Sequence, residues 1–161
     1  MNSTLQEMKI EYKGRNEIAS TIISVIRGVT RNKTIISLII NDPLPLPDGV
    51  IEQLLKDNNT LQALSLYIPD RILSSSLNIV EVNTPLTALE IGRKRSSKLM
   101  TSLLPHIKGL HCLILHDPYP PHLLFLSHPS LHTLTLPLDT AESAIELFTI
   151  LQTNTTLKAL S

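Results

Sequence analysis

The chain has 161 residues, enough for one domain with a substantial buried core. Fourteen basic and fourteen acidic residues give a formal net charge of zero, which argues against nucleic-acid binding, because phosphate contacts call for a basic excess. The single cysteine, Cys112, excludes an internal disulfide, and no apolar stretch is long enough for a signal peptide or a membrane span, so we expect a cytoplasmic protein without membrane insertion.

One pattern, Leu-x-x-Leu-x-Leu, recurs along the whole chain and predicts a short β-strand at each copy. It is clearest in two stretches, 58–66 and 154–161, which both read Thr-Leu-x-Ala-Leu-Ser after an asparagine turn. From Ile35 onward the first positions of the copies lie 21 to 26 residues apart, and the step from Leu5 to Ile35 is longer. The copies consist of Leu5, Met8 and Ile10; Ile35, Leu38 and Ile40; Leu61, Leu64 and Leu66; Leu86, Leu89 and Ile91; Leu110, Leu113 and Leu115; Leu131, Leu134 and Leu136; and Leu157 with Leu160.

Segments of helical periodicity separate these copies. In chain order, the predicted helices run from an Asn16 cap through Val29, from Asp48-Gly49 through Leu55, from Leu73 to Val80 after Pro69-Asp70, and from Ser96-Ser97 to Ile107, with Pro105 interrupting the last turn. The next interval is shorter, and Pro118-Tyr119-Pro120-Pro121 leaves room only for a turn through Leu123 to Leu126.

The last interval carries a capping-box signature, Asp139 followed by Glu142. It predicts a helix whose buried face is formed by Ile145, Phe148 and Leu151. Strands that alternate with helices imply a parallel sheet with right-handed crossovers. We therefore expect an α/β fold and one repeat domain over residues 1–161, an open stack with strands on the concave face and helices on the convex face.

Asparagines precede several of the predicted strands in Asn-x-Ser/Thr triplets, namely Asn32, Asn58 and Asn154. We interpret them as turn residues whose side chains bind the local backbone. With these turns, the repeat resembles the ribonuclease-inhibitor type of leucine-rich repeat and is similar to the repeats of NOD-like receptors. That family places Asn or Cys three residues after the last strand leucine, whereas this chain has Pro43, Pro69, Lys94, Pro118 and Asp139 there.

The resemblance implies an open horseshoe without enzymatic activity that binds another protein. By this resemblance it would be the ligand-sensing or autoinhibitory repeat region of an innate immune sensor. The alternative within the same class is a substrate-recognition adaptor of the ubiquitin-ligase or GTPase-regulator type. Because neither end carries a polar capping unit, we expect a fragment of a longer protein, with self-association through the terminal strands as the second interpretation.

The expected binding surface is the concave face, with the residues that follow each strand. Binding energy concentrates in a few Tyr, Trp and Arg side chains, so Tyr67 and Arg93 are its predicted centre. Ile36, Ile39 and Ile114 also point outward by this register. The predicted binding residues are Gln62, Ser65, Tyr67, Thr87, Glu90, Arg93, His111, His116, Asp117, His132 and Thr135. The plainer interpretation of each is solvated surface.

The sequence contains no glycine-rich phosphate loop and no His-Glu-x-x-His, and we predict no catalytic residue, no cofactor and no metal site. His111 and His132 occupy the same position in adjacent copies and are expected to be neighbours about 4.8 Å apart on a polar ladder. A zinc site is the less favoured interpretation, since it needs four converging ligands, or three and a water. A hydrolase that uses His111 or His132 with Asp117 remains the remote alternative.

Two further motifs have a functional and a plain interpretation. The basic run from Arg93 to Lys98 matches a kinase site, a localisation signal or an anion-binding loop, but a solvated loop is favoured. The Pro-x-x-Pro motif at 118–121 matches ligands of aromatic grooves, but a stiff repeat loop is favoured.

Overall fold

The computed structural model describes residues 5–11, 19–41, 46–47, 49–68, 82, 84–92 and 97–161. Within this part, seven parallel strands form one open sheet in sequence order, and five α-helices and one short 3-10 helix connect them. The strands are β1 (Glu7–Glu11), β2 (Ser37–Asn41), β3 (Ala63–Tyr67), β4 (Ala88–Ile91), β5 (Cys112–Leu115), β6 (Thr133–Thr135) and β7 (Ala159–Leu160). The helices are α1 (Ala19–Arg31), α2 (Val50–Asp57), α3 (Ser97–Leu103), η2 (Leu104–His106), α4 (Pro121–Ser127) and α5 (Ala141–Leu151).

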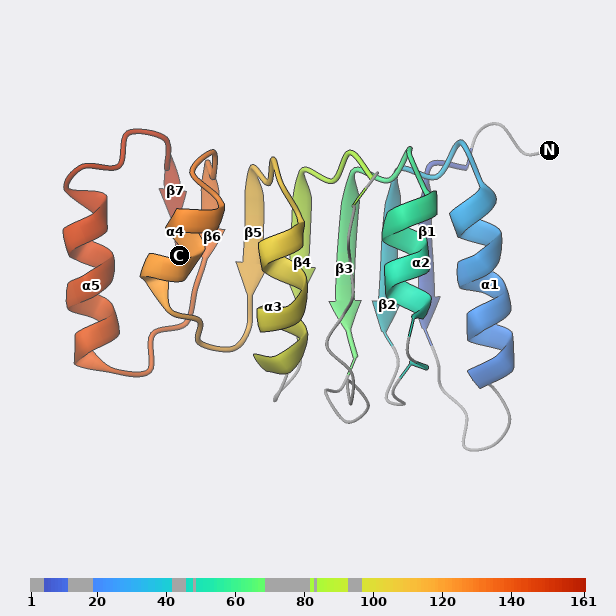
Figure 1. The fold of residues 1–161 in the computed structure, drawn as a ribbon, viewed down its shortest axis with the longest axis horizontal. Helices are drawn as coiled ribbons and strands as arrows, with labels where there is room; N and C mark the ends of the chain where they lie inside the picture. Colours follow the sequence, from blue (N-terminus) through green and yellow to red (C-terminus); the bar gives the residue numbers. More distant parts are fainter. Residues whose placement is uncertain are drawn as a thin grey trace.

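Figure 1 shows the helices in one layer on a single face of the sheet, as expected when every crossover has the same hand. The predicted α/β class and parallel strands are therefore confirmed. In the described ranges, no helix is both long and apolar enough to cross a membrane.

The strand register confirms the repeat template. Its middle positions align across the whole sheet, in the order Met8, Leu38, Leu64, Leu89, Leu113, Leu134 and Leu160. The first positions of the five interior copies, Ile35, Leu61, Leu86, Leu110 and Leu131, are each at most 2% exposed and belong to one core. The end copies are less covered, because Leu5 and Leu160 have a neighbouring copy on one side only.

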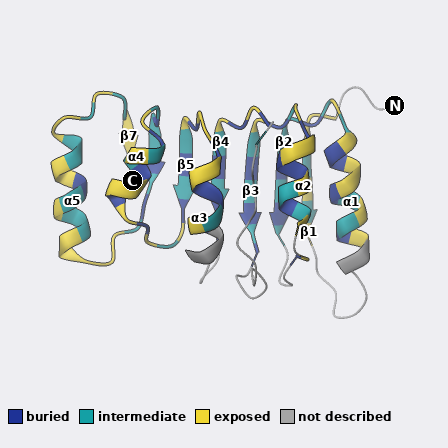
Figure 2. Ribbon diagram, viewed as in Figure 1, coloured by how far each residue is buried: buried dark blue, intermediate teal, exposed yellow. Residues whose placement is uncertain are grey.

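Burial alternates along the strands, since successive side chains point to opposite faces. Figure 2 shows buried and half-buried residues alternating along the strands. The buried residues share one core with residues of the helices, and those on the other face are only half-buried. No described element covers that second face, which we name the open sheet face. Along β2 to β6 it carries Ser37, Ile39, Asn41, Ala63, Ser65, Tyr67, Ala88, Glu90, Cys112, Ile114, Thr133 and Thr135.

The predicted asparagine turns are confirmed. In the turn before β3, Asn58 Oδ1 accepts hydrogen bonds from the backbone N–H groups of Thr60 (2.9 Å) and Leu61 (2.8 Å). Asn58 Nδ2 donates to the carbonyl of Val29 in the preceding unit (3.0 Å), so a fully buried side chain joins two units. The acceptor pattern recurs at Asn32 and Asn154.

The first two helices bury the faces that periodicity predicts, with Ile22, Ile26 and Val29 on α1, and Ile51, Leu54 and Leu55 on α2. Two later predictions are wrong. The segment expected to hold only a turn forms α4, because Pro121 lies in the first turn of the helix, where a missing N–H costs nothing.

The prediction for α5 is the second error. Its cap is Thr140, whose hydroxyl accepts from the Ser143 N–H at 3.0 Å, and not Asp139. Ile145 and Phe148 are 66% and 65% exposed, while Leu147 is buried, so the helix turns a different face to the core. The Asn16 cap, the helix expected from Leu73 to Val80, Arg93, and the loop positions Pro43, Pro69 and Lys94 lie outside the described residues.

Candidate protein-binding site on the open sheet face

Four polar side chains meet on the open sheet face where β3, β4 and β5 end. Ser65 and Tyr67 come from β3, Glu90 comes from β4, and His116 directly follows β5. Strand register places Ser65 opposite Glu90. We name these four residues the Glu90 cluster, and all four were predicted from sequence to face the binding surface.

Glu90 is the acceptor at the centre of the cluster. Ser65 Oγ donates to Glu90 Oε2 at 3.1 Å, and His116 Nε2 lies 2.9 Å from Glu90 Oε1. Because a carboxylate only accepts, His116 carries its proton on Nε2 in this contact. The Tyr67 hydroxyl also donates to Glu90, and the Tyr67 and His116 rings meet edge-on with centroids 6.0 Å apart.

This network shifts the titration of two of its members. Partial burial opposes ionisation of Glu90, but hydrogen bonds from Tyr67, His116 and Ser65 outweigh burial and lower the pKa of the carboxyl. Burial, the hydrogen bond to Glu90 and the charge of Glu90 together raise the pKa of Tyr67 to about 12. At neutral pH the cluster therefore presents a carboxylate ringed by donors and a neutral tyrosine.

Gly92 is a residue of this site that the sequence analysis missed. A Cβ atom at Gly92 would lie 2.5 Å from Cδ1 and Cε1 of Tyr67 and 3.3 Å from Cδ2 of His116. Only glycine lets the tyrosine ring lie this close to the backbone after β4 and reach Glu90. The signal was present, because a glycine beside a strand pattern often marks the close approach of another group.

The structure places the remaining predicted residues around this cluster. Gln62 and Thr87 are exposed one residue before β3 and β4, and the Thr87 hydroxyl donates to the Gln62 carbonyl at 3.3 Å. Thr135 shares a hydrogen bond of 2.9 Å with Ser161 across β6 and the chain end. Asp117 is half-buried two residues after β5, and Arg93 lies outside the described residues.

The predicted histidine neighbours are confirmed. His111 and His132 stack with ring centroids 4.9 Å apart, and their Nδ1 atoms lie 3.0 Å apart. They precede β5 and β6, at the end of the sheet opposite to His116. In the described ranges, no three His, Cys, Asp or Glu side chains are grouped so that they could hold a metal ion.

The arrangement does not suit hydrolysis. A serine nucleophile needs a histidine between itself and the acid, whereas here Glu90 lies between Ser65 and His116. His111 and Asp117 lie at opposite ends of β5, on the order of 15–20 Å apart along an extended strand, too far for proton transfer. Neither set of residues is therefore arranged as a serine-type catalytic relay.

The Pro-x-x-Pro motif is partly engaged in the fold. Tyr119 of the Pro-x-x-Pro motif is 7% exposed, burial raises the pKa of its hydroxyl, and Pro121 begins α4. Tyr119 is thus part of the core, and Pro121 is part of a helix. Most of the basic run, residues 93–96, lies outside the described residues.

Comparisons with known proteins leave function to be argued from this geometry. No protein-family model matches the chain, and a search of curated proteins finds no match either. The Glu90 cluster and the open sheet face are therefore the observations from which a function is inferred.

Proposed function

We propose that this chain is a non-enzymatic leucine-rich repeat solenoid that binds another protein through the open sheet face, with Tyr67 at the centre of the contact. The observation that carries the proposal is the preorganised Tyr67 ring. It is held by Gly92 below and by the Glu90 carboxylate at its hydroxyl, on a sheet face that no described element covers.

Preorganisation supports recognition because a side chain that is already ordered loses little conformational entropy on binding. Tyrosine combines a large apolar ring with a polar tip and is enriched among the residues that dominate interface energies. Half-buried Ile39 and Ile114 lie in the same strand row as Ser65 and Glu90, so apolar contact area flanks the polar cluster.

Repeat architecture supports the same proposal. Extended surfaces built from stacked repeats serve as binding faces, and the sequence resemblance is to leucine-rich repeats of cytoplasmic sensors. We assign the chain to that role, as a ligand-sensing or autoinhibitory repeat segment. The separation of His111 from Asp117 and the position of Glu90 between Ser65 and His116 disfavour the hydrolase alternative.

Site-specific photocrosslinking in cells tests this proposal. A benzoylphenylalanine placed at Thr87, exposed directly before β4 and next to Ala88 of the open sheet face, is expected to capture a discrete partner. The same group at Leu126, 81% exposed on the helix layer, is expected to capture none. With the captured protein purified, Tyr67→Ala should raise the dissociation constant about 30-fold, the loss of affinity typical of an interface hot spot.

Two variants separate contact from folding. Tyr67→Phe keeps the ring and loses only the hydroxyl bond to Glu90, so it should bind more tightly than Tyr67→Ala. Gly92→Ala should displace the ring and weaken binding while Tyr67 itself is retained. Unchanged affinity in Tyr67→Ala, with a thermal transition like that of the parent chain, would reject the proposal.

A further inference from the structure

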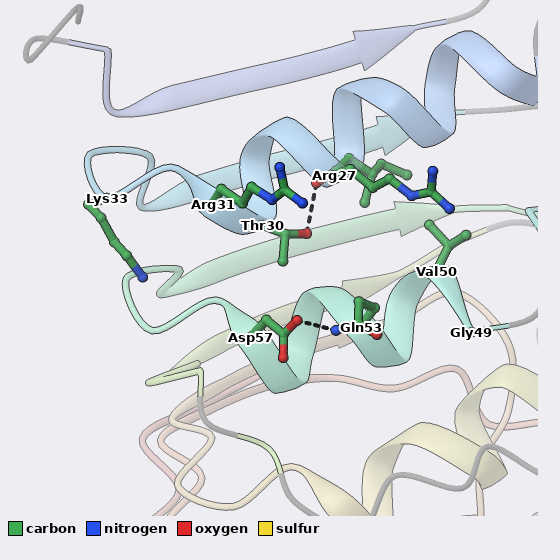
Figure 3. Close-up of a pocket in the computed structure, with 9 residues that line it drawn as sticks. Arg27, Thr30, Arg31, Lys33, Gly49, Val50, Gln53 and Asp57 are labelled. Carbon is green, nitrogen blue, oxygen red and sulfur yellow. Dashed lines mark hydrogen bonds between the residues drawn. The ribbon is translucent and has the colours of Figure 1, made fainter.

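A groove between α1 and α2 lies on the helix side of the sheet, away from the Glu90 cluster (Figure 3). Arg27 and Arg31 line it from α1, and Gln53 and Asp57 line it from α2. Lys33, in the turn after α1, lies at one end. Its volume of about 690 Å³ falls within the range of known ligand sites, roughly 300–1,000 Å³.

The groove is positively charged in a chain whose formal net charge is zero. Its lining contains the three cations and one carboxylate, that of Asp57. Asp57 accepts a hydrogen bond from the Gln53 amide, and Lys33 Nζ donates to Asn59 Oδ1 at 2.7 Å. Among the described residues, neither guanidinium has an ion-pair partner.

Arg27 and Arg31 are four residues apart on one helix, so they lie on the same face with Cβ atoms about 6 Å apart. In an extended peptide, side chains two residues apart point to the same side at about 6.6–6.8 Å. The spacing of the two arginines therefore matches two acidic side chains at alternate positions of an extended strand. Each guanidinium binds a carboxylate through paired hydrogen bonds.

We propose that this groove binds an extended acidic peptide segment with Asp or Glu at alternate positions, through Arg27 and Arg31. Both arginines are exposed, so a peptide reaches them without separation of the helices. Nucleic acids fit less well, because proteins that bind phosphate backbones carry an excess of basic residues, and this chain has none. This site is separate from the open sheet face.

Fluorescence anisotropy with a labelled Glu-x-Glu-x-Glu peptide tests the proposal. We expect saturable binding that weakens about tenfold in Arg27→Gln and in Arg31→Gln, the loss of one charge-assisted contact in each. Arg31→Lys keeps the charge but not the planar fork and should also weaken binding. Lys158→Gln removes the same charge from an exposed site before β7 and should change nothing.

Each control has an outcome that overturns the proposal. Equal losses in Lys158→Gln and the arginine variants would mean general charge attraction. Equal binding of a peptide with its glutamates in one consecutive block would overturn the spacing argument. Tighter, arginine-dependent binding of an oligonucleotide or a phosphopeptide would overturn the ligand class, and absence of saturable binding would overturn the site. Tyr67→Ala should leave the peptide affinity unchanged, which separates this test from that of the open sheet face.

Discussion

The turns that lead into β3 and β6 occupy the same place in the repeat but use different side chains. Asn58 and His128 each stand three residues before the first apolar position of a copy, Leu61 or Leu131. In both turns the backbone N–H of this residue donates to a carbonyl of the preceding helix: Asn58 to Leu54 at 3.0 Å, and His128 to Leu124 at 2.9 Å. Both side chains are buried, Asn58 at 0% and His128 at 1% exposed.

The side chains then differ in what they satisfy. Asn58 uses its carbonyl and its amide to join the local turn to the neighbouring unit. Neither ring nitrogen of His128 has a hydrogen-bond partner in the described part of the chain. Burial, and then the charge of Lys108, lowers the pKa of His128 to about 4. A repeat position thus tolerates a buried imidazole, but only in its neutral form.

The largest expected effect is at Asn58. Asn58→Ala should lower the free energy of unfolding by about 3 kcal/mol, because it leaves buried groups of two units without partners. Urea denaturation measures it. Asn59→Ala is the matched control, since Asn59 is exposed and should cost less than about 0.5 kcal/mol. Equal losses of stability at the two positions would show that the hydrogen bond from Asn58 to the neighbouring unit adds nothing to the free energy of unfolding.

The next effect is pH-dependent stability through His128. Its folded pKa, about 4, lies below the ordinary 6.5, so its contribution is fully present above pH 6.5 and is lost as pH falls toward 4. The loss amounts to roughly 3 kcal/mol by proton linkage. His128→Asn should flatten this part of the pH profile, measured by urea denaturation at several pH values.

The control for the pH experiment is His106→Asn, an exposed histidine in η2. It should leave the acid dependence as in the parent chain. If His128→Asn changed the profile no more than His106→Asn did, the buried imidazole would not be the acid-sensitive group. If His128→Asn also raised stability at pH 8, the new asparagine would have formed, in the turn before β6, the hydrogen bonds that Asn58 forms in the turn before β3.

The smallest effect is expected at Asn154. Its Oδ1 accepts from the N–H groups of Thr156 and Leu157, as in the turn of Asn58, but the side chain is only half-buried. Asn154→Ala should cost about 1 kcal/mol, since water reaches the freed N–H groups. A loss equal to that of Asn58→Ala would show that the local turn, and not the bond to the neighbouring unit, dominates the comparison.

Much of the fold was predictable because the repeat imposes one pattern many times. Strand positions, register, the buried faces of α1 and α2, and the asparagine turns all follow from local periodicity. The errors fall toward the C-terminal end, where α4 replaces an expected turn and α5 exposes Ile145 and Phe148. Periodicity shows that a helix has an apolar face, but the packing of neighbouring units decides which residues are covered.

The candidate site divides in the same way. Alternation along the strands placed Ser65, Tyr67 and Glu90 on the outward face, and the repeat step made neighbours of His111 and His132. The hydrogen bonds that converge on Glu90, and the need for glycine at position 92, were not predictable. They depend on side-chain rotamers and on distances of a few tenths of an ångström, which spacing in the sequence does not encode.

By itself, the sequence of this protein determined the order of strands, the direction in which each strand residue points and the residues of the shared core, because each follows from a periodicity of two or of one repeat. Only the tertiary structure decided which polar groups meet: Glu90 with its three donors, His128 without a partner, and Arg27 and Arg31 beside α2. The physical reason is the distance along the chain over which each property is set. Periodicity is a property of neighbouring residues, whereas hydrogen bonding and burial depend on how separate units pack.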